Sequence, residues 1–180
     1  MAWPVTSTRI VYENPWIRVR EDEVIRPDGA PGVFGVVELR RPAVFVVPLT
    51  ADDEVVLVEV DRHTTGRSLE VPAGGTDGQD VLAAAARELA EEAGLVADEL
   101  EVVGSTFALN GVCVAPEHVV LARGLHPAPS PDASQREEGI GAVHTVAWRD
   151  LLALVHTGAI SDGETVAALM LVALHLGRVG

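Results

Sequence analysis

Three glutamates stand close together in residues 87–95, at Glu88, Glu91 and Glu92. Side chains three or four positions apart lie on one face of a helix, so a helix here would carry all three carboxylates on one broad face. Like charges at this spacing destabilise an isolated helix by about 0.2–0.5 kcal/mol per pair. A positive partner is therefore expected, and oxygen ligands favour a hard divalent cation such as Mg²⁺.

Residues 87–95 read Arg-Glu-Leu-Ala-Glu-Glu-Ala-Gly-Leu, which resembles the second half of the Nudix box. Residues 69–74, Leu-Glu-Val-Pro-Ala-Gly, and residues 62–67, Arg-His-Thr-Thr-Gly-Arg, are similar to segments that precede this box in ADP-ribose pyrophosphatase-like members. The chain is thus identified as a member of the Nudix hydrolases that resembles this subfamily.

The resemblance implies hydrolysis of the pyrophosphate bond in a nucleoside diphosphate linked to another group. ADP-ribose or another nucleotide sugar is the expected small-molecule partner, and the products are a nucleoside monophosphate and a sugar phosphate. The implied cofactor is Mg²⁺, with Mn²⁺ as an alternative. Two other functions stay open: a non-catalytic Nudix module that senses a nucleotide, and a Nudix enzyme acting on dinucleotides or coenzyme A.

The resemblance also assigns roles in catalysis. Glu88 and Glu92 are implied metal ligands together with the backbone carbonyl of Ala73, and Glu91 is implied as a ligand or as a carboxylate supporting the ligands. A further carboxylate is expected from a loop after the proline-rich stretch, where we select Glu138 as a catalytic and metal-binding residue. Glu137 is the alternative.

Four residues are expected to bind the substrate. Arg62 and Arg67 are candidates to contact the diphosphate or the terminal ribose. Glu70 is expected to bind the family arginine or the substrate ribose, and Glu117 lies in a segment similar to the subfamily. Arg87, which directly precedes Glu88, is expected to orient the loop before the helix and the neighbouring carboxylates, because its guanidinium is a rigid fork of donors.

The chain departs from the family pattern at Gln79, which stands eight positions before Arg87, where the family has a glutamate. Counting back from Gln79 places Ala73 at the family glycine, so the loop is one residue short. Gln79 still accepts a hydrogen bond but brings no charge. We expect weaker orientation of Arg87 or weaker metal affinity rather than loss of the reaction.

The chain is expected to divide into a small antiparallel β unit over residues 1–41 and a Nudix hydrolase domain over residues 42–180. Short β-branched and aromatic runs predict the strands of the first unit, in which Trp16 and Phe34 are expected to be buried rather than to stack on a base. So small a sheet is not stable alone. By the resemblance it forms a homodimer.

For residues 42–180 we expect an α/β (α+β) Nudix fold, which is an α/β/α sandwich with a mixed sheet. Apolar runs predict strands over residues 43–49 and 54–60, and further strands are expected around 100–108 and 117–123. A four-residue apolar period predicts a helix between Asp80 as N-cap and Gly94 as stop. Two more helices are expected over 150–156 and from a capping box at Ser161 to Gly177, and a loop over 126–135.

Composition narrows the classes of protein to which the chain can belong. The 180 residues carry a formal charge of −14, which opposes binding to nucleic acid. No apolar run reaches the length of a membrane span. Residues 1–5 lack a basic segment followed by an apolar core, so no secretory signal is expected. The single cysteine, Cys113, excludes an internal disulfide and suits a reducing compartment. The expected location is the cytoplasm.

Overall fold

The computed structural model describes residues 3–129 and 139–179. The chain divides into two compact units, the first made of Met1–Pro42 and Phe107–Glu117 and the second of Ala43–Thr106 and His118–Gly180. Each unit is described by itself.

The first unit is a four-stranded sheet in the order β1-β2-β3-β9. Its strands are β1 (Val5–Glu13), β2 (Ile17–Ile25), β3 (Pro31–Leu39) and β9 (Cys113–Val114). The first three pair antiparallel, as expected, and β9 pairs parallel with β3. The strands are longer than the short runs that predicted them, because polar residues such as Thr8, Glu21 and Asp22 continue the ladder.

Burial of Trp16 in this sheet was a wrong prediction. Trp16 is 72% exposed, because it lies in the β1–β2 turn, where the side chain of Asn14 accepts hydrogen bonds from the backbone N–H groups of Trp16 and Ile17. Phe34 is half-buried and packs edge-on against Trp3, with ring centroids 5.5 Å apart. Every residue of β1 is exposed.

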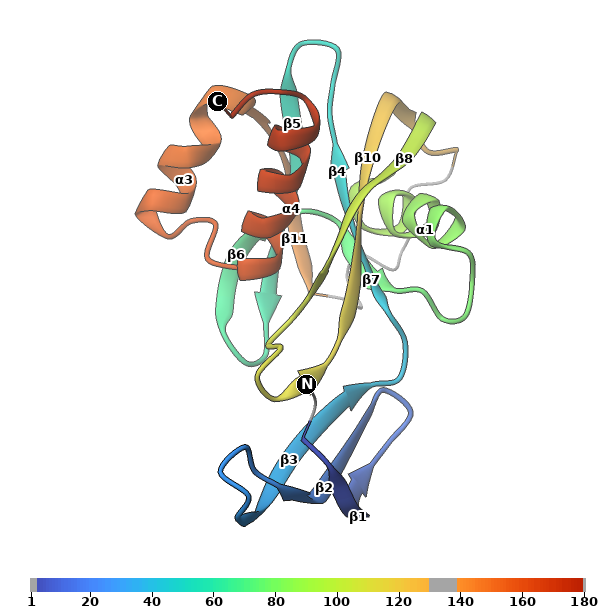
Figure 1. The fold of residues 1–180 in the computed structure, drawn as a ribbon. Coiled ribbons are helices and arrows are strands. Elements are labelled where there is room, and N and C mark those ends of the chain that lie inside the picture. Colours follow the sequence, from blue (N-terminus) through green and yellow to red (C-terminus); the bar gives the residue numbers. More distant parts are fainter. Residues whose placement is uncertain (1–2, 130–138, 180) are drawn as a thin grey trace. The chain divides into compact units, whose positions relative to one another are not determined.

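The second unit holds two sheets, in the orders β7-β4-β10-β8 and β11-β5-β6 (Figure 1). Their strands are β4 (Ala43–Pro48), β5 (Glu54–Arg62), β6 (Gly66–Glu70), β7 (Ala73–Gly75), β8 (Leu95–Phe107), β10 (Pro116–Pro127) and β11 (Ile140–Ala147). The helical segments are α1 (Val81–Ala93), the 3-10 turn η1 (Trp148–Asp150), α3 (Leu151–Thr157) and α4 (Gly163–His175). None of the described helices is long and apolar enough to cross a membrane.

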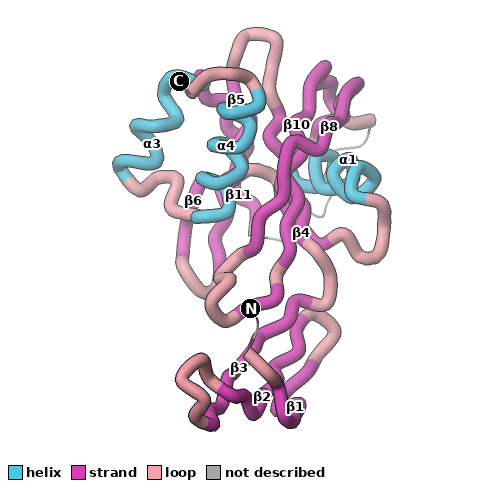
Figure 2. Tube along the Cα trace, viewed as in Figure 1, coloured by secondary structure: helices cyan, strands magenta, loops and turns pink. Residues whose placement is uncertain are grey.

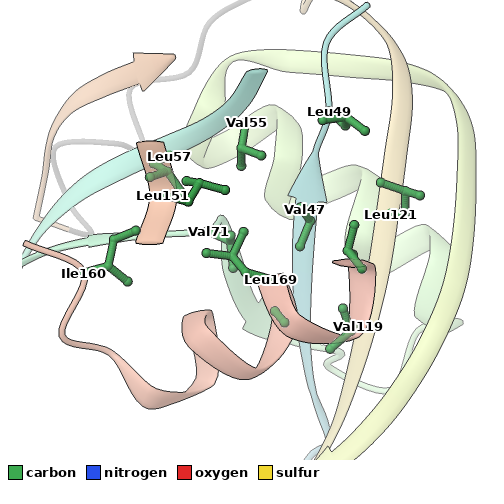
Figure 3. Packing of buried hydrophobic residues seen from close by; sticks show 12 residues of the cluster. Val47, Leu49, Val55, Leu57, Val71, Val119, Leu121, Leu151, Ile160 and Leu169 are labelled. Carbon is green, nitrogen blue, oxygen red and sulfur yellow. The ribbon is translucent and has the colours of Figure 1, made fainter. Parts of the chain in front are cut away.

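Both faces of these sheets are covered, as the tube in Figure 2 shows: α1 lies on one side and α3 and α4 lie on the other. Successive side chains of a strand point to opposite faces. Val47 and Val55 accordingly join a core with α4, drawn in Figure 3, whereas Val46 and Val56 join a second core with α1. Two covered faces explain why β4 and β5 read as continuous apolar runs. The α/β/α sandwich with mixed sheets is confirmed.

The caps of α1 are those predicted. The Asp80 carboxylate accepts hydrogen bonds from the backbone N–H groups of Leu82 and Ala83, and Gly94 ends the helix in a left-handed conformation with φ +66°. The predicted start of α4 at Ser161 was wrong by one residue. Asp162 is the N-cap and accepts from the Thr165 N–H, while the Ser161 hydroxyl is bonded to that of Ser68.

Other boundaries also moved. β8 begins at Leu95, directly after the helix, instead of near residue 100, and β10 continues to Pro127, beyond the predicted start of the loop. Four strands, β6, β7, β9 and β11, were not predicted. They are short or glycine-rich, or they alternate without a strong apolar pattern, so their pairing partners define them.

Candidate active site

The α1 helix turns two carboxylates into the protein. Glu88 and Glu92 are 3% and 4% exposed, and they lie beside the core residues Ala85 and Leu89 on the buried side of the helix. Burying ionised groups is costly unless they are hydrogen-bonded or paired. Both have a partner: the Glu88 Oε1 lies 2.8 Å from the Arg87 Nη2, and the Glu92 Oε2 accepts from the Ala73 backbone N–H at 2.8 Å. Glu91 is half-buried on the same helix.

The segment that the glutamates face is β7, which pairs antiparallel with β4 and is held there by the register Phe45↔Ala73. Gly74 leaves room for Glu88: a Cβ built on Gly74 would lie 2.1 Å from the Glu88 Oε1. A residue with a side chain therefore fits there only if the Glu88 carboxylate moves. The Ala73–Gly74 peptide therefore lies in direct contact with the carboxylates of Glu88 and Glu92.

Arg87 ties this contact together. Its Nη1 is 2.8 Å from Glu91, its Nη2 donates to the Gly75 carbonyl at 2.7 Å, and its Nε donates to the Gln79 side chain at 3.1 Å. Burial by itself lowers the pKa of Arg87, but the hydrogen bonds and charges of Glu91 and Glu88 outweigh it and leave that pKa above its usual value. The arginine stays protonated and makes the contacts that an orienting role requires.

Gln79 belongs to a tight loop between β7 and α1. The Gln79 N–H donates to the Thr76 carbonyl, and Asp77 and Gly78 between them have positive φ angles of +51° and +82°. The Asp77 carboxylate is 3.7 Å from the Arg87 Nη2. The shortened loop thus still presents two acceptors, one neutral and one charged, to the same guanidinium.

Arg62 and Glu70 form a second charge pair, in which Glu70 is buried and Arg62 is exposed. The Arg62 Nη2 and Nε lie 2.6 and 3.2 Å from the Glu70 Oε2, and Glu70 is only 5% exposed. The hydrogen bond to Glu70 raises the pKa of Arg62, and this outweighs the lowering by burial, with smaller contributions from the charges of Glu92 and Asp162. The influence of Glu92 places this pair in the electrostatic field of the helix carboxylates.

Arg67 is largely exposed and lies 3.3 Å from Glu59. Both residues line an open cavity of about 350 Å³, together with Asp61 and the stretch from Gly139 to Gly141. Gly139 is the first described residue after position 138. Glu137 and Glu138 lie outside the described residues.

Glu117 is buried, at the second position of β10, and belongs to the first unit. The structure therefore brings Glu88, Glu91, Glu92 and the Ala73 peptide together, and it brings Glu70 together with Arg62. Gly74 and Asp77 are site residues that the sequence argument missed. Gly74 directly follows the Ala73 chosen as a ligand, so the glycine itself was the signal for a close approach of backbone to side chain.

The donors at this site suit a hard cation. Glu88, Glu92 and the Ala73 carbonyl offer oxygen atoms only, which matches the preference of Mg²⁺. Among the described residues no three side chains of His, Cys, Asp or Glu form a group placed to hold a metal. The chemistry of these two carboxylates and one carbonyl is nevertheless that of ligands to a divalent ion.

Two family models match the chain. Residues 3–37 match the nucleoside diphosphate sugar hydrolase N-terminal domain, and residues 39–169 match the NUDIX domain. The second match covers more than half of the chain.

Two individual relatives and one solved structure are also similar to the chain. The chain is 32% identical over 145 residues to the ADP-ribose pyrophosphatase of Mycobacterium tuberculosis (strain ATCC 25618 / H37Rv), over 79% of this chain and 68% of that one. It is 27% identical over 165 residues to the methanol dehydrogenase activator of Bacillus methanolicus, over 90% and 88% of the two chains. The crystal structure of an ADP compounds hydrolase has the same fold, with a TM-score of 0.84 at 23% identity over 99% and 98% of the chains.

Proposed function

The chain belongs to the Nudix hydrolase family, and on that premise we propose that it is an Mg²⁺-dependent diphosphohydrolase that splits ADP-ribose or another nucleotide sugar into a nucleoside monophosphate and a sugar phosphate. The observation that carries the proposal is the buried pair Glu88 and Glu92 facing the Ala73–Gly74 peptide. The names of the M. tuberculosis relative and of the N-terminal domain model support an ADP-sugar as substrate.

The proposed ion binds Glu88, Glu92 and the Ala73 carbonyl, with Glu138 as a further ligand. When bound, it neutralises charge on the diphosphate and lowers the pKa of water. The protein supplies the rest: Arg87 holds Glu88 and Glu91 in place, and the Ala73 N–H fixes the Glu92 carboxylate. Glu138 is the proposed acceptor of the proton from the attacking water, with Glu137 as the alternative.

Arg62, Arg67, Glu70 and Glu117 are the proposed substrate contacts. Arg62 is already bound to Glu70, so its free donors have a fixed direction before substrate arrives. Preorganised donors lose little entropy on binding. Arg67 is held less firmly, by a single contact to Glu59, and can turn toward a diphosphate.

The proposal divides the chain into domains at residues 1–41 and 42–180. It includes a homodimer formed through the first unit and a cytoplasmic location. The exposed apolar side chains of the first unit support the dimer, since Ile10, Tyr12 and Trp16 are all at least half exposed. Exposed apolar surface of sufficient extent marks protein contacts.

A panel of nucleotide sugars, dinucleotides and coenzyme A, incubated with Mg²⁺ and followed for nucleoside monophosphate, tests the reaction. Turnover of ADP-ribose or another nucleotide sugar, and its loss on chelation, is the expected result. Glu92→Gln should lower kcat at least about 100-fold at an unchanged melting temperature. The matched control Glu99→Gln, on an exposed position after the helix, should keep full turnover.

The second function, a nucleotide sensor without turnover, rests on the neutral Gln79 and the short loop. A sensor binds a nucleotide sugar in calorimetry and leaves it intact after prolonged incubation with Mg²⁺. Binding without product over the whole panel would replace the hydrolase proposal by this one. Equal turnover in the Glu92→Gln variant would instead refute the metal assignment.

A further inference from the structure

A second cavity, of about 580 Å³, lies in the second unit away from the helix carboxylates. It is formed by the β4–β5 turn, the end of β10 and the residues after α4, which Figure 1 shows at one end of this unit. Cavities of about 300–1,000 Å³ are typical of small-molecule sites. None of the residues proposed for the hydrolase lines it.

The walls of this cavity combine apolar and cationic side chains. Leu49, Leu125 and Leu176 supply apolar surface, while Arg123 and Arg178 supply positive charge. The chain as a whole carries a formal charge of −14 with 13 Lys and Arg, so two arginines at one cavity stand out from the acidic surface. A cavity lined in this way suits an anion attached to an apolar body.

The two arginines differ in how they are held. Arg178 is fixed: it forms an ion pair with Asp53, and its guanidinium stacks over the Trp148 ring at 4.4 Å from the centroid. Gly177, with φ +65°, turns the chain after α4 so that the Arg178 N–H donates back to the Ala173 carbonyl. The position of this charge is therefore built into the C-terminal turn of the helix.

Arg123 is half-buried, and its side chain makes no hydrogen bond or ion pair within residues 3–129 and 139–179. The nearby His126 is already engaged, since its Nε2 is 3.0 Å from the Asp98 carboxylate. Asp53, the acidic residue on the cavity wall, is bound to Arg178. Arg123 is thus the cation left over at the wall, and its planar fork matches a phosphate or carboxylate.

We propose that this cavity is a second ligand site, which binds a small organic oxyanion through Arg123 with its apolar part against the leucine wall. The site is separate from the hydrolase centre and does not depend on the reaction proposed above. Phosphate esters and carboxylates share the required chemistry, and probes with the same ring distinguish them.

Phenyl phosphate, phenylacetate and inorganic phosphate are the probes, titrated into the full-length protein without Mg²⁺ and followed by calorimetry and tryptophan fluorescence. Trp148 reports on the cavity because it contacts Arg178. We expect saturable binding of phenyl phosphate, phenylacetate or both with a dissociation constant below about 1 mM, and at least tenfold weaker binding of inorganic phosphate, which lacks the apolar part. The ring-bearing probe that binds more tightly identifies the anion class.

Arg123→Gln should weaken binding by about 10- to 100-fold, the loss of a charge-assisted hydrogen bond, and Arg123→Lys should lose less. Arg149→Gln is the matched control, because it removes one exposed positive charge next to Trp148 but not from the cavity wall. The Trp148→Phe variant should bind without the fluorescence change. Equal affinity in the Arg123→Gln variant, a signal that persists without Trp148, or no saturation by either ring-bearing probe would overturn the proposal.

Discussion

At the residue scale, the site depends on how closely Gly74 approaches Glu88. The buried carboxylate occupies the space where any other residue would carry its Cβ. A side chain here would push Glu88 away from the position that its pairing with Arg87 sets. Position 74 therefore controls the geometry of a carboxylate that is distant from it in sequence.

Gly74→Ala should lower kcat about 100-fold, because a displacement of about 1 Å at a reacting centre has that effect, and overpacking should cost about 1–3 kcal/mol of stability. Turnover and chemical unfolding measure the two effects. The control is Gly163→Ala, where an added Cβ meets nothing within 4 Å. Full turnover in Gly74→Ala would show that Glu88 does not need its present position.

Gln79 offers a second test at this scale. Gln79→Ala removes the acceptor of the Arg87 Nε and should reduce kcat/KM several-fold, whereas Gln79→Glu keeps an acceptor, adds a charge and should retain or increase it. Because the pKa of Arg87 is raised, its charge persists to strongly alkaline pH, and the difference between the two variants should be constant from pH 6 to 9. Equal losses in both variants would show that the loop, not the acceptor, matters.

The sequence was sufficient to locate the residues of the helix site but not their partners. The spacing of Glu88, Glu91 and Glu92 predicted a shared face, and the structure has two of them buried and one half-buried. The same spacing could not reveal that Glu92 accepts from the Ala73 N–H or that Arg62 pairs with Glu70. Those contacts join strands and a helix that pair only after folding.

At the element scale, α1 is both a structural and a chemical element. Its core side, with Ala85 and Leu89, packs on β4 and β5, and this packing fixes the rotation of the helix about its axis. The rotation in turn fixes where Glu88 and Glu92 point. Its caps keep the first and last turns intact, so the positions of both carboxylates along the helix axis are fixed.

Asp80→Ala should therefore lower the free energy of unfolding by about 1 kcal/mol, the usual contribution of an N-cap, and the melting temperature by about 2–4 °C. The reason is the loss of the acceptor for the Leu82 and Ala83 N–H groups. Calorimetry measures both values. Asp52→Ala, in an exposed turn, serves as control and should change stability by less than about 0.5 kcal/mol. A neutral Asp80→Ala would mean that packing alone holds the first turn.

Element boundaries were predicted where local chemistry decides them. Asp80 and Gly94 mark the ends of α1 because their side chain or backbone conformation acts within one turn. β7 and β11 escaped prediction, since a three-residue strand such as Ala73–Gly75 exists only through its pairing with β4. Trp16 was misassigned because an aromatic residue was taken as buried where an asparagine turn exposes it.

At the scale of the whole molecule, the first unit carries apolar surface that its own fold leaves open. Ile10, Tyr12 and Trp16 are exposed, although the sheet also buries Val24 and Val36. Burial of these side chains against a partner would stabilise so small a sheet. We propose that the partner is a second copy of the chain.

Sedimentation or light scattering should accordingly give twice the chain mass of 19.0 kDa. Replacing both Ile10 and Trp16 by Asp should shift the protein to the single-chain mass, because charges would then face charges across the contact. The control Leu152→Asp, at a 76% exposed position on α3, should leave the mass unchanged. A single-chain mass for the unmodified protein at micromolar concentration would refute the dimer.

The strand before the active-site peptide is fastened to the C-terminal part of the chain. The buried Thr165 hydroxyl, in the first turn of α4, receives the Val71 N–H, and the Leu69 N–H donates to the Ala159 carbonyl. Ala73 follows only two residues after Val71. The last helix consequently helps to fix the position at which the Ala73 N–H meets the Glu92 carboxylate. Removing that helix from the carboxyl end of the protein should therefore weaken hydrolysis without removing any acidic group from the site.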